Sequence, residues 1–72
     1  MSVARNFEVS STSNVSFEDA INKGIQGVSD DINNIKGAWI KEQKVEINGG
    51  KISAYNVMMI VTAIAGDVGK TG

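Results

Sequence analysis

The first half of the chain changes from alternating polarity to helical spacing. Between Val3 and Ser11, apolar and polar residues alternate, which is typical of a short half-buried strand. A polar loop, Ser11 to Asn14, is expected to follow. From Ser16 onward, apolar side chains recur every three or four residues and form one stripe, which predicts an amphipathic helix. Ser16 is a good N-cap, and the helix should end near Asn33-Asn34, because asparagine tolerates the left-handed conformation.

The predicted helix contains two glycines and ends in an acidic pair. Gly24 and Gly27 each cost roughly 0.5–1 kcal/mol relative to alanine in a helix interior. We interpret them as positions where the helix packs closely on a sheet; the alternative is that the destabilisation is simply tolerated. Asp30 and Asp31 are neighbours, and neighbouring helical residues do not face each other. The pair is therefore interpreted as solvating the helix end rather than as a metal site.

The second half of the chain is predicted to form two strands joined by a tight turn. The first strand runs from about Lys36 to Ile47, and its apolar positions change phase, which predicts a bulge or bend near Lys41 to Lys44. The turn Asn48-Gly49-Gly50 is a strong hairpin signal. In the last strand, Ile52 to Ile64, both even and odd positions carry apolar groups. Because side chains alternate faces along a strand, this strand must be covered on two sides.

The order of elements predicts an α+β fold, β-α-β-β, with a three-stranded antiparallel sheet wrapped around one helix. A single domain is expected over residues 1–72, with a flexible tail at about residues 66–72. One helix covers one face of the sheet, so the other face must contact another copy of the protein or a ligand. A chain of 72 residues is marginally stable alone, since it buries only about 60% of its unfolded surface. Without cysteine, oligomerisation is the expected remedy.

The composition excludes several kinds of chemistry. The chain has no Cys and no His, which removes thiol catalysis, the commonest general base and the commonest metal ligands. An enzyme would depend on Lys41 or Tyr55 acting alone, so no catalytic residue is predicted. The net charge is −1 and the seven Lys and Arg are scattered, so nucleic-acid binding is not expected. The apolar run Val57 to Ala65 is too short for a membrane-spanning helix and the N-terminus lacks a signal-peptide core, so we expect a cytoplasmic protein.

An aromatic residue and two amides are candidates for ligand contacts. Trp39, the single tryptophan, shares a strand face with Gly37 and is expected to be partly exposed. Tryptophan suits both interfaces and stacking, so Trp39 either fills a subunit interface or stacks on a planar ligand. Asn56 is the one amide within the apolar last strand and needs a partner, from neighbouring backbone or from the polar edge of a ligand. Gln43, near the predicted bend, is a second candidate of this kind.

The chain resembles the dodecin family of small flavin-binding proteins from about Val3 to Ile64. The β-α-β-β order and the chain length agree with that family. The stretches that carry the resemblance are Ser16-Phe17, Ala20, Ile25, Asp30, Ile32, Asn34 and Ile35 around the helix, and Glu42 to Ile47, Gly49-Gly50-Lys51 and Tyr55-Asn56-Val57 in the hairpin. The resemblance implies a hollow spherical homododecamer. It also implies flavins bound in stacked pairs between subunits, where they are stored or sequestered rather than converted.

The resemblance further implies a ligand site, at which this sequence departs from the family. Dodecins typically place a tryptophan at the start of the second strand, where it sandwiches the isoalloxazine rings, and counting without gaps puts Gly37 there. Trp39 follows two residues later, on the same face and roughly 6.6–7 Å along the strand. The glutamine that reads the polar edge of the flavin falls at Asn56, whose side chain is one methylene shorter. The expected cofactor-binding residues are Trp39, Asn56, Gly37 and Gln43, and no metal ligands are predicted.

Two functions remain open from the sequence. The first is a homo-oligomeric binding protein that holds riboflavin, FMN or a similar planar ligand between subunits. The second is a dodecin-fold assembly that has lost flavin binding and has a structural role or binds another small ligand or an ion. Neither function involves nucleic acid or a membrane.

Overall fold

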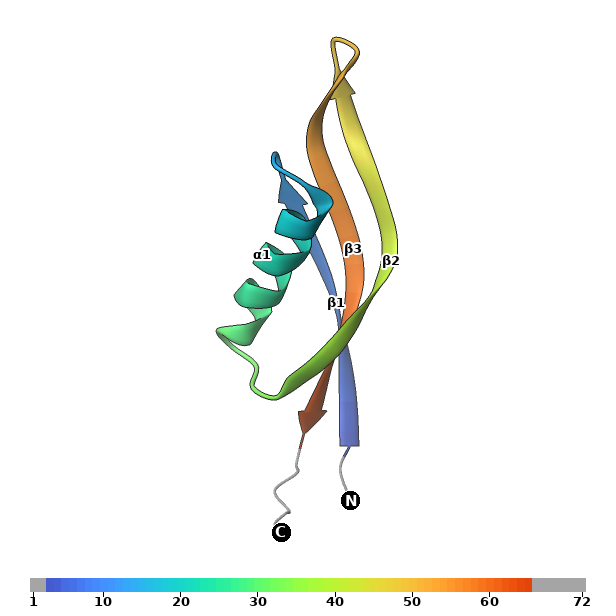
Figure 1. Cartoon of the computed structure of the whole chain (residues 1–72). Coiled ribbons are helices and arrows are strands. Elements are labelled where there is room, and N and C mark those ends of the chain that lie inside the picture. Colours follow the sequence, from blue (N-terminus) through green and yellow to red (C-terminus); the bar gives the residue numbers. More distant parts are fainter. Residues whose placement is uncertain (1–2, 66–72) are drawn as a thin grey trace.

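The computed structural model describes residues 3–65, and these form the predicted order of elements. The elements are β1 (Val3–Ser13), α1 (Phe17–Ser29), β2 (Ile35–Asn48) and β3 (Lys51–Ala65). The strands pair antiparallel in the order β1-β3-β2. Figure 1 shows α1 on one side of the sheet, next to β1 and β3, and the β2–β3 hairpin extending beyond the helix. The fold prediction is confirmed, and the predicted tail at residues 66–72 lies outside the described residues.

The central position of β3 explains why this strand is apolar on both faces. Its odd-numbered side chains between residues 57 and 63 lie on the face toward α1 and Ala20 and are at most 3% exposed: Val57, Met59, Val61 and Ala63. Its even-numbered side chains alternate to the other side of the sheet, which we call the open face, and they are partly exposed. Within residues 3–65, no element covers the open face (Figure 1).

The edge strand β2 also leaves large apolar side chains in solvent. The exposed fractions are 54% for Trp39, 39% for Ile40 and 59% for Ile47, and Ile52 at the start of β3 is 50% exposed. A long edge strand with exposed apolar residues is a surface for association. This exposure agrees with the expectation that Trp39 is partly exposed.

The start of α1 is fixed by hydrogen bonds from serine side chains. The Ser16 hydroxyl accepts a hydrogen bond from the Asp19 backbone N–H at 2.9 Å, as predicted for an N-cap. The Asp19 carboxylate accepts one from the buried Ser13 hydroxyl at 2.6 Å. The Ser13 hydroxyl lowers the pKa of Asp19, partial burial opposes this shift, and Lys23 lowers the pKa further. Ser13 thus ties the end of β1 to the first turn of the helix.

Two predicted boundaries were wrong. The stretch Ser11 to Ser13 is not loop but the end of β1, because it pairs with residues 55–57 of β3. Strand pairing here overrides the local preference of serine and threonine for loops. The helix ends at Ser29 rather than near Asn33-Asn34, with Asp30 as its C-cap. Asn34 does adopt a left-handed conformation, with φ 62°, but in the connection to β2.

The predicted irregularities in the hairpin are confirmed. The register between β2 and β3 shifts between Ile40 and Glu42, which leaves Lys41 as the extra residue of a bulge. The turn places Gly49 and Gly50 at φ 61° and 80°. Positive φ at both central residues is characteristic of a type I′ hairpin turn, whose twist matches that of the flanking strands.

The two helical glycines differ in their surroundings. A Cβ added at Gly24 would lie 2.5 Å from the Met59 methyl and 3.1 Å from Ser11 Cβ, so the close-packing interpretation holds there. A Cβ added at Gly27 would meet nothing within 4 Å, so that interpretation was wrong for this position. Gly24 therefore sets how closely α1 approaches the sheet.

These surroundings predict opposite effects of alanine at the two positions. Gly24→Ala should lower stability by about 1–3 kcal/mol, because the new methyl group would crowd both the buried Met59 methyl and Ser11 Cβ, which is held on β1. Gly27→Ala should raise it by about 0.5–1 kcal/mol through helix propensity alone. Urea unfolding at one fixed protein concentration measures both variants. Shifts of the midpoint in the same direction would contradict the packing role of Gly24.

Candidate functional site

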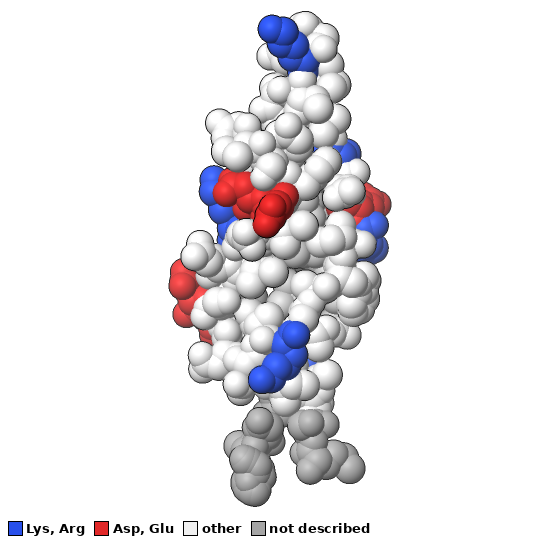
Figure 2. Space-filling model, in the orientation of Figure 1, with Lys and Arg blue, Asp and Glu red and all other residues white. Residues whose placement is uncertain are grey.

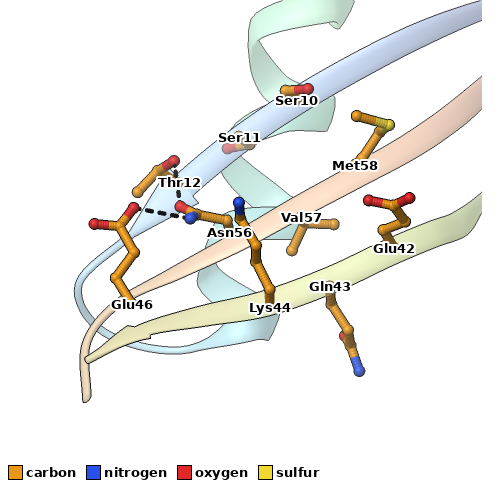
Figure 3. Close-up of a pocket in the computed structure, with 10 residues that line it drawn as sticks. All are labelled: Ser10, Ser11, Thr12, Glu42, Gln43, Lys44, Glu46, Asn56, Val57 and Met58. Carbon is orange, nitrogen blue, oxygen red and sulfur yellow. Dashed lines mark hydrogen bonds between the residues drawn. The ribbon is translucent and has the colours of Figure 1, made fainter. Parts of the chain in front are cut away.

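A groove of about 300 Å³ lies on the sheet where the ends of β1, β3 and β2 run side by side (Figure 3). Its polar lining comes mainly from the open face, where β1 contributes hydroxyls and β2 contributes charged side chains. The residues that line it are Ser10, Ser11, Thr12, Glu42, Gln43, Lys44, Glu46, Asn56, Val57 and Met58. The groove is open on a single chain, so a bound molecule would keep one side uncovered.

Asn56 lies at the centre of a hydrogen-bonded row that crosses all three strands. Thr12 Oγ1 on β1 donates to Asn56 Oδ1 at 2.8 Å, and Asn56 Nδ2 donates to Glu46 Oε2 on β2 at 2.8 Å (Figure 3). This row fixes the amide with its oxygen toward β1 and its nitrogen toward β2. An amide has two N–H donors and two acceptor lone pairs. Asn56 therefore retains one donor and one acceptor that can serve a ligand.

Two further polar contacts cross the open face. Thr62 Oγ1 donates to Asn6 Oδ1 at 2.9 Å and joins β3 to β1. The Lys41 ammonium, from the bulge in β2, lies 3.5 Å from Glu8 on β1. Both side chains of this ion pair are about half-exposed, 52% and 53%, so the pair contributes little stability. The open face thus combines polar pairs with partly exposed apolar side chains of β3.

Three of the four candidate residues share the open face. Gly37 pairs with Thr62 and Trp39 pairs with Ile60. Positions 37 and 39 of β2 therefore belong to the same face of the sheet as Asn56. Trp39 pairs four residues along β3 from Asn56, which is roughly 13 Å at the usual strand rise. Trp39 lies outside the lining of the groove, on the exposed edge of the sheet.

Gln43 is separated from the other candidates. It pairs with Val57, whose side chain packs in the core beneath α1, and therefore belongs to the opposite face of the sheet. Figure 3 shows the Gln43 side chain directed away from Asn56 and Lys44. Its backbone borders the groove while its amide does not reach the row around Asn56.

Sequence reasoning missed the two partners of Asn56. Thr12 was assigned to a loop, and Glu46 was read only as part of a stretch that resembles the family. The signal for Thr12 was the alternating pattern of the first strand, because extending that strand by one residue beyond Ser11 includes Thr12, which pairs with Asn56. Glu46 reaches Asn56 diagonally, since its direct partner on β3 is Ala54. Such diagonal contacts depend on the register and cannot be read from one strand alone.

The charges of the molecule are dispersed. Figure 2 shows Lys and Arg as separate spots on the viewed face, with acidic groups near several of them. Within residues 3–65, no group of three or more His, Cys, Asp or Glu side chains is arranged to hold a metal ion. The described part of the chain also contains no helix that is both long and apolar enough to cross a membrane.

Comparison with known proteins assigns the family. The sequence matches the family Dodecin over residues 3–63, which is most of the chain. The chain belongs to the dodecin family. Comparison with curated proteins gives no match.

Solved dodecin structures share the fold. A dodecin from Streptomyces davaonensis is 25% identical, with 88% of this chain and 93% of that chain covered and a TM-score of 0.82. An arginine-to-alanine mutant of the Thermus thermophilus dodecin is 20% identical, with coverage of 89% and 96% and a TM-score of 0.84. The calcium dodecin of Mycobacterium tuberculosis, a calcium-chelating antigen with a calcium-binding site, is 28% identical, with coverage of 83% and 86% and a TM-score of 0.73.

The row around Asn56 predicts a specific effect of removing one hydroxyl. Thr12→Val keeps the shape of the side chain but removes the donor to Asn56 Oδ1. The Asn56 side-chain amide should then show shifted NMR resonances and faster exchange with solvent. Thr62→Val is the matched control, because it breaks the bond to Asn6 and leaves Asn56 untouched. Equal disturbance of the Asn56 amide by both variants would contradict the row.

Proposed function

We propose that this chain is a homo-oligomeric binding protein that stores or sequesters riboflavin, FMN or a similar planar ligand between subunits. The single observation that carries this proposal is the combination, in a dodecin-family chain, of an exposed Trp39 and an oriented Asn56 amide on the uncovered face of the sheet. In this function Trp39 stacks on the ring system and Asn56 hydrogen-bonds to its polar edge.

A site between subunits follows from the openness of the groove. Ligand sites bury most of the surface of a small molecule, and this groove is uncovered on one side. A second copy seated on the open face would supply the missing wall. The same contact would cover the apolar side chains of β3 and the exposed edge of β2. The homododecamer proposed here takes its number of subunits from the family, and the proposed location is the cytoplasm.

The proposed mechanism is sequestration rather than catalysis. A flavin stacked on tryptophan at van der Waals distance loses its excited state to the protein, so binding would suppress its photochemistry. Such binding requires a complementary pocket shape, ring stacking and hydrogen bonds. None of these interactions needs a general base or a nucleophile. The side chains assigned to the site, an indole and an amide, carry no group that titrates near neutral pH.

A second function is favoured by the space at Gly37. The resemblance puts Gly37 at the family's tryptophan position, and a Cβ added there would meet nothing within 4 Å, so in the single chain this space is empty. The Asn56 amide also has two partners within the chain. These two observations support an assembly that has kept the fold and lost flavin binding. The calcium dodecin among the structural relatives supports an ion or another small molecule as the ligand of such an assembly.

Titration with riboflavin and FMN tests the first function. Purified protein should quench flavin fluorescence in a saturable way, and Trp39→Ala should weaken binding at least about tenfold. Trp39→Phe, which keeps an aromatic ring, should retain more of the affinity than alanine does. Sedimentation should show the same assembly size for all three proteins.

A different outcome at Trp39 assigns it to the subunit interface. In that case Trp39→Ala would weaken the assembly itself, by about 3–5 kcal/mol for a well-buried site. A dissociated variant in sedimentation would then contradict the stacking role.

Restoring the family's tryptophan tests the second function. Gly37 lies on an exposed edge strand with free space on the open face, so the single chain should fold normally with Gly37→Trp, and sedimentation checks its assembly. If the site was lost through this position, Gly37→Trp should create saturable flavin quenching in a protein that otherwise shows none. Gly37→Leu is the control for added bulk without an aromatic ring. Quenching by both variants, or by neither, would count against a site lost through Gly37.

A further inference from the structure

We infer that the groove around Asn56 selects uncharged planar ligands over phosphorylated ones, so that the riboflavin class is preferred to the FMN class. This inference rests on the proposed function and names the ligand class of the same site. It is carried by the placement of two carboxylates and one ammonium along the wall that β2 contributes to the groove.

The charges on this wall alternate in a fixed row. After the bulge at Lys41, the residues of β2 that point to the open face are Glu42, Lys44 and Glu46, which lie opposite Met58, Asn56 and Ala54. Alternate residues of a strand are roughly 6.6–7 Å apart. Lys44 is thus flanked on both sides by a carboxylate, and the row carries a net charge of −1.

The Glu46 carboxylate lies beside the Asn56 amide at the groove. Its Oε2 accepts the hydrogen bond from Asn56 Nδ2, and Asn56 is in turn held by Thr12. A hydrogen bond to an ionised carboxylate is stronger than one between neutral groups, so this bond favours the position of Glu46 beside Asn56. The amide that would read the edge of a ligand therefore has a negative charge beside it.

Lys44 does not provide a free phosphate site to balance this charge. The one cation that lines the groove lies between Glu42 and Glu46, so any anion that approaches it also approaches two carboxylates. Elsewhere on the open face, the Lys41 ammonium lies 3.5 Å from the Glu8 carboxylate, so an anion that approaches Lys41 also approaches a negative charge. A phosphate monoester carries about −1.5 to −2 charges at pH 7, and such a group meets net repulsion along this wall. An uncharged ring with an amide-like edge meets only the donor and acceptor of Asn56.

Parallel titrations of riboflavin and FMN at low ionic strength test the inference. These two probes share one ring system and differ in the phosphate, so their affinity ratio isolates the charge effect. The wild-type protein should bind riboflavin at least about tenfold more tightly than FMN, and added salt should shrink this ratio. Glu42→Gln and Glu46→Gln, which keep shape and hydrogen-bonding capacity, should each lower the ratio, and the double variant should bring it close to one.

Two controls make the test specific. Glu18→Gln removes the same charge from the exposed start of α1 and should leave the ratio unchanged. Lys44→Gln should raise the ratio, since it removes the cation from the wall. Assembly size is measured for every variant, so that a change in ratio is read only from intact protein.

The outcomes distinguish this inference from the proposed function. Equal quenching by riboflavin and FMN would overturn the charge selection and leave flavin binding in place. Tighter binding of FMN, weakened by Lys44→Gln, would overturn it and identify Lys44 as a phosphate contact. Saturable quenching by neither flavin, in an assembled protein, would overturn the proposed function and this inference together.

Discussion

The structure depends on the double-sided burial demanded by β3. This strand pairs with neighbours along both edges and carries apolar groups on both faces, yet the described chain has one helix to cover it. The side under α1 becomes a core, in which Met59 and Val61 are fully buried. The other side keeps apolar side chains at a surface. A chain this small gains most by covering that surface with a second copy, and so the question of its function becomes a question about the open face.

The polar side chains of the open face limit what can cover it. A purely apolar face would not fix the register of a second copy, whereas Thr12, Asn56 and Glu46 form a hydrogen-bonded row that crosses the sheet at one place. Buried polar groups must keep their partners, so any covering surface has to leave this row intact or replace its bonds. The row therefore favours a boundary where a polar ligand edge or an ordered partner meets the sheet, rather than a fully dry interface.

The face of the sheet to which each β2 side chain points shows what the sequence alone can and cannot predict. Alternation predicted correctly which residues of β3 share a face, because β3 pairs with β1 in an unbroken register from Tyr55 to Ala65. In β2 the bulge at Lys41 reverses the parity: Trp39 points to the open face before it, and Lys44 does so after it. The phase change predicted a bulge somewhere between Lys41 and Lys44, and the face of Gln43 depends on its exact place. The partners of Asn56 were hidden for a related reason, since a contact between strands exists only once their register is known.

The proposed ligand site would depart from that of the family in two ways, and both would act in the same direction. Gly37 pairs with Thr62 and Trp39 pairs with Ile60, so moving the indole from the first position to the second brings it roughly 6.6–7 Å nearer to Asn56 along the sheet. In the proposed correspondence with the family, the amide at Asn56 would also be one methylene shorter than the glutamine. A ring system held by both groups must then lie nearer to the hairpin end of the open face than in a site built around Gly37. That end is where Glu42 and Glu46 stand, so the shift of the aromatic residue and the charge of the wall act on the same ligand.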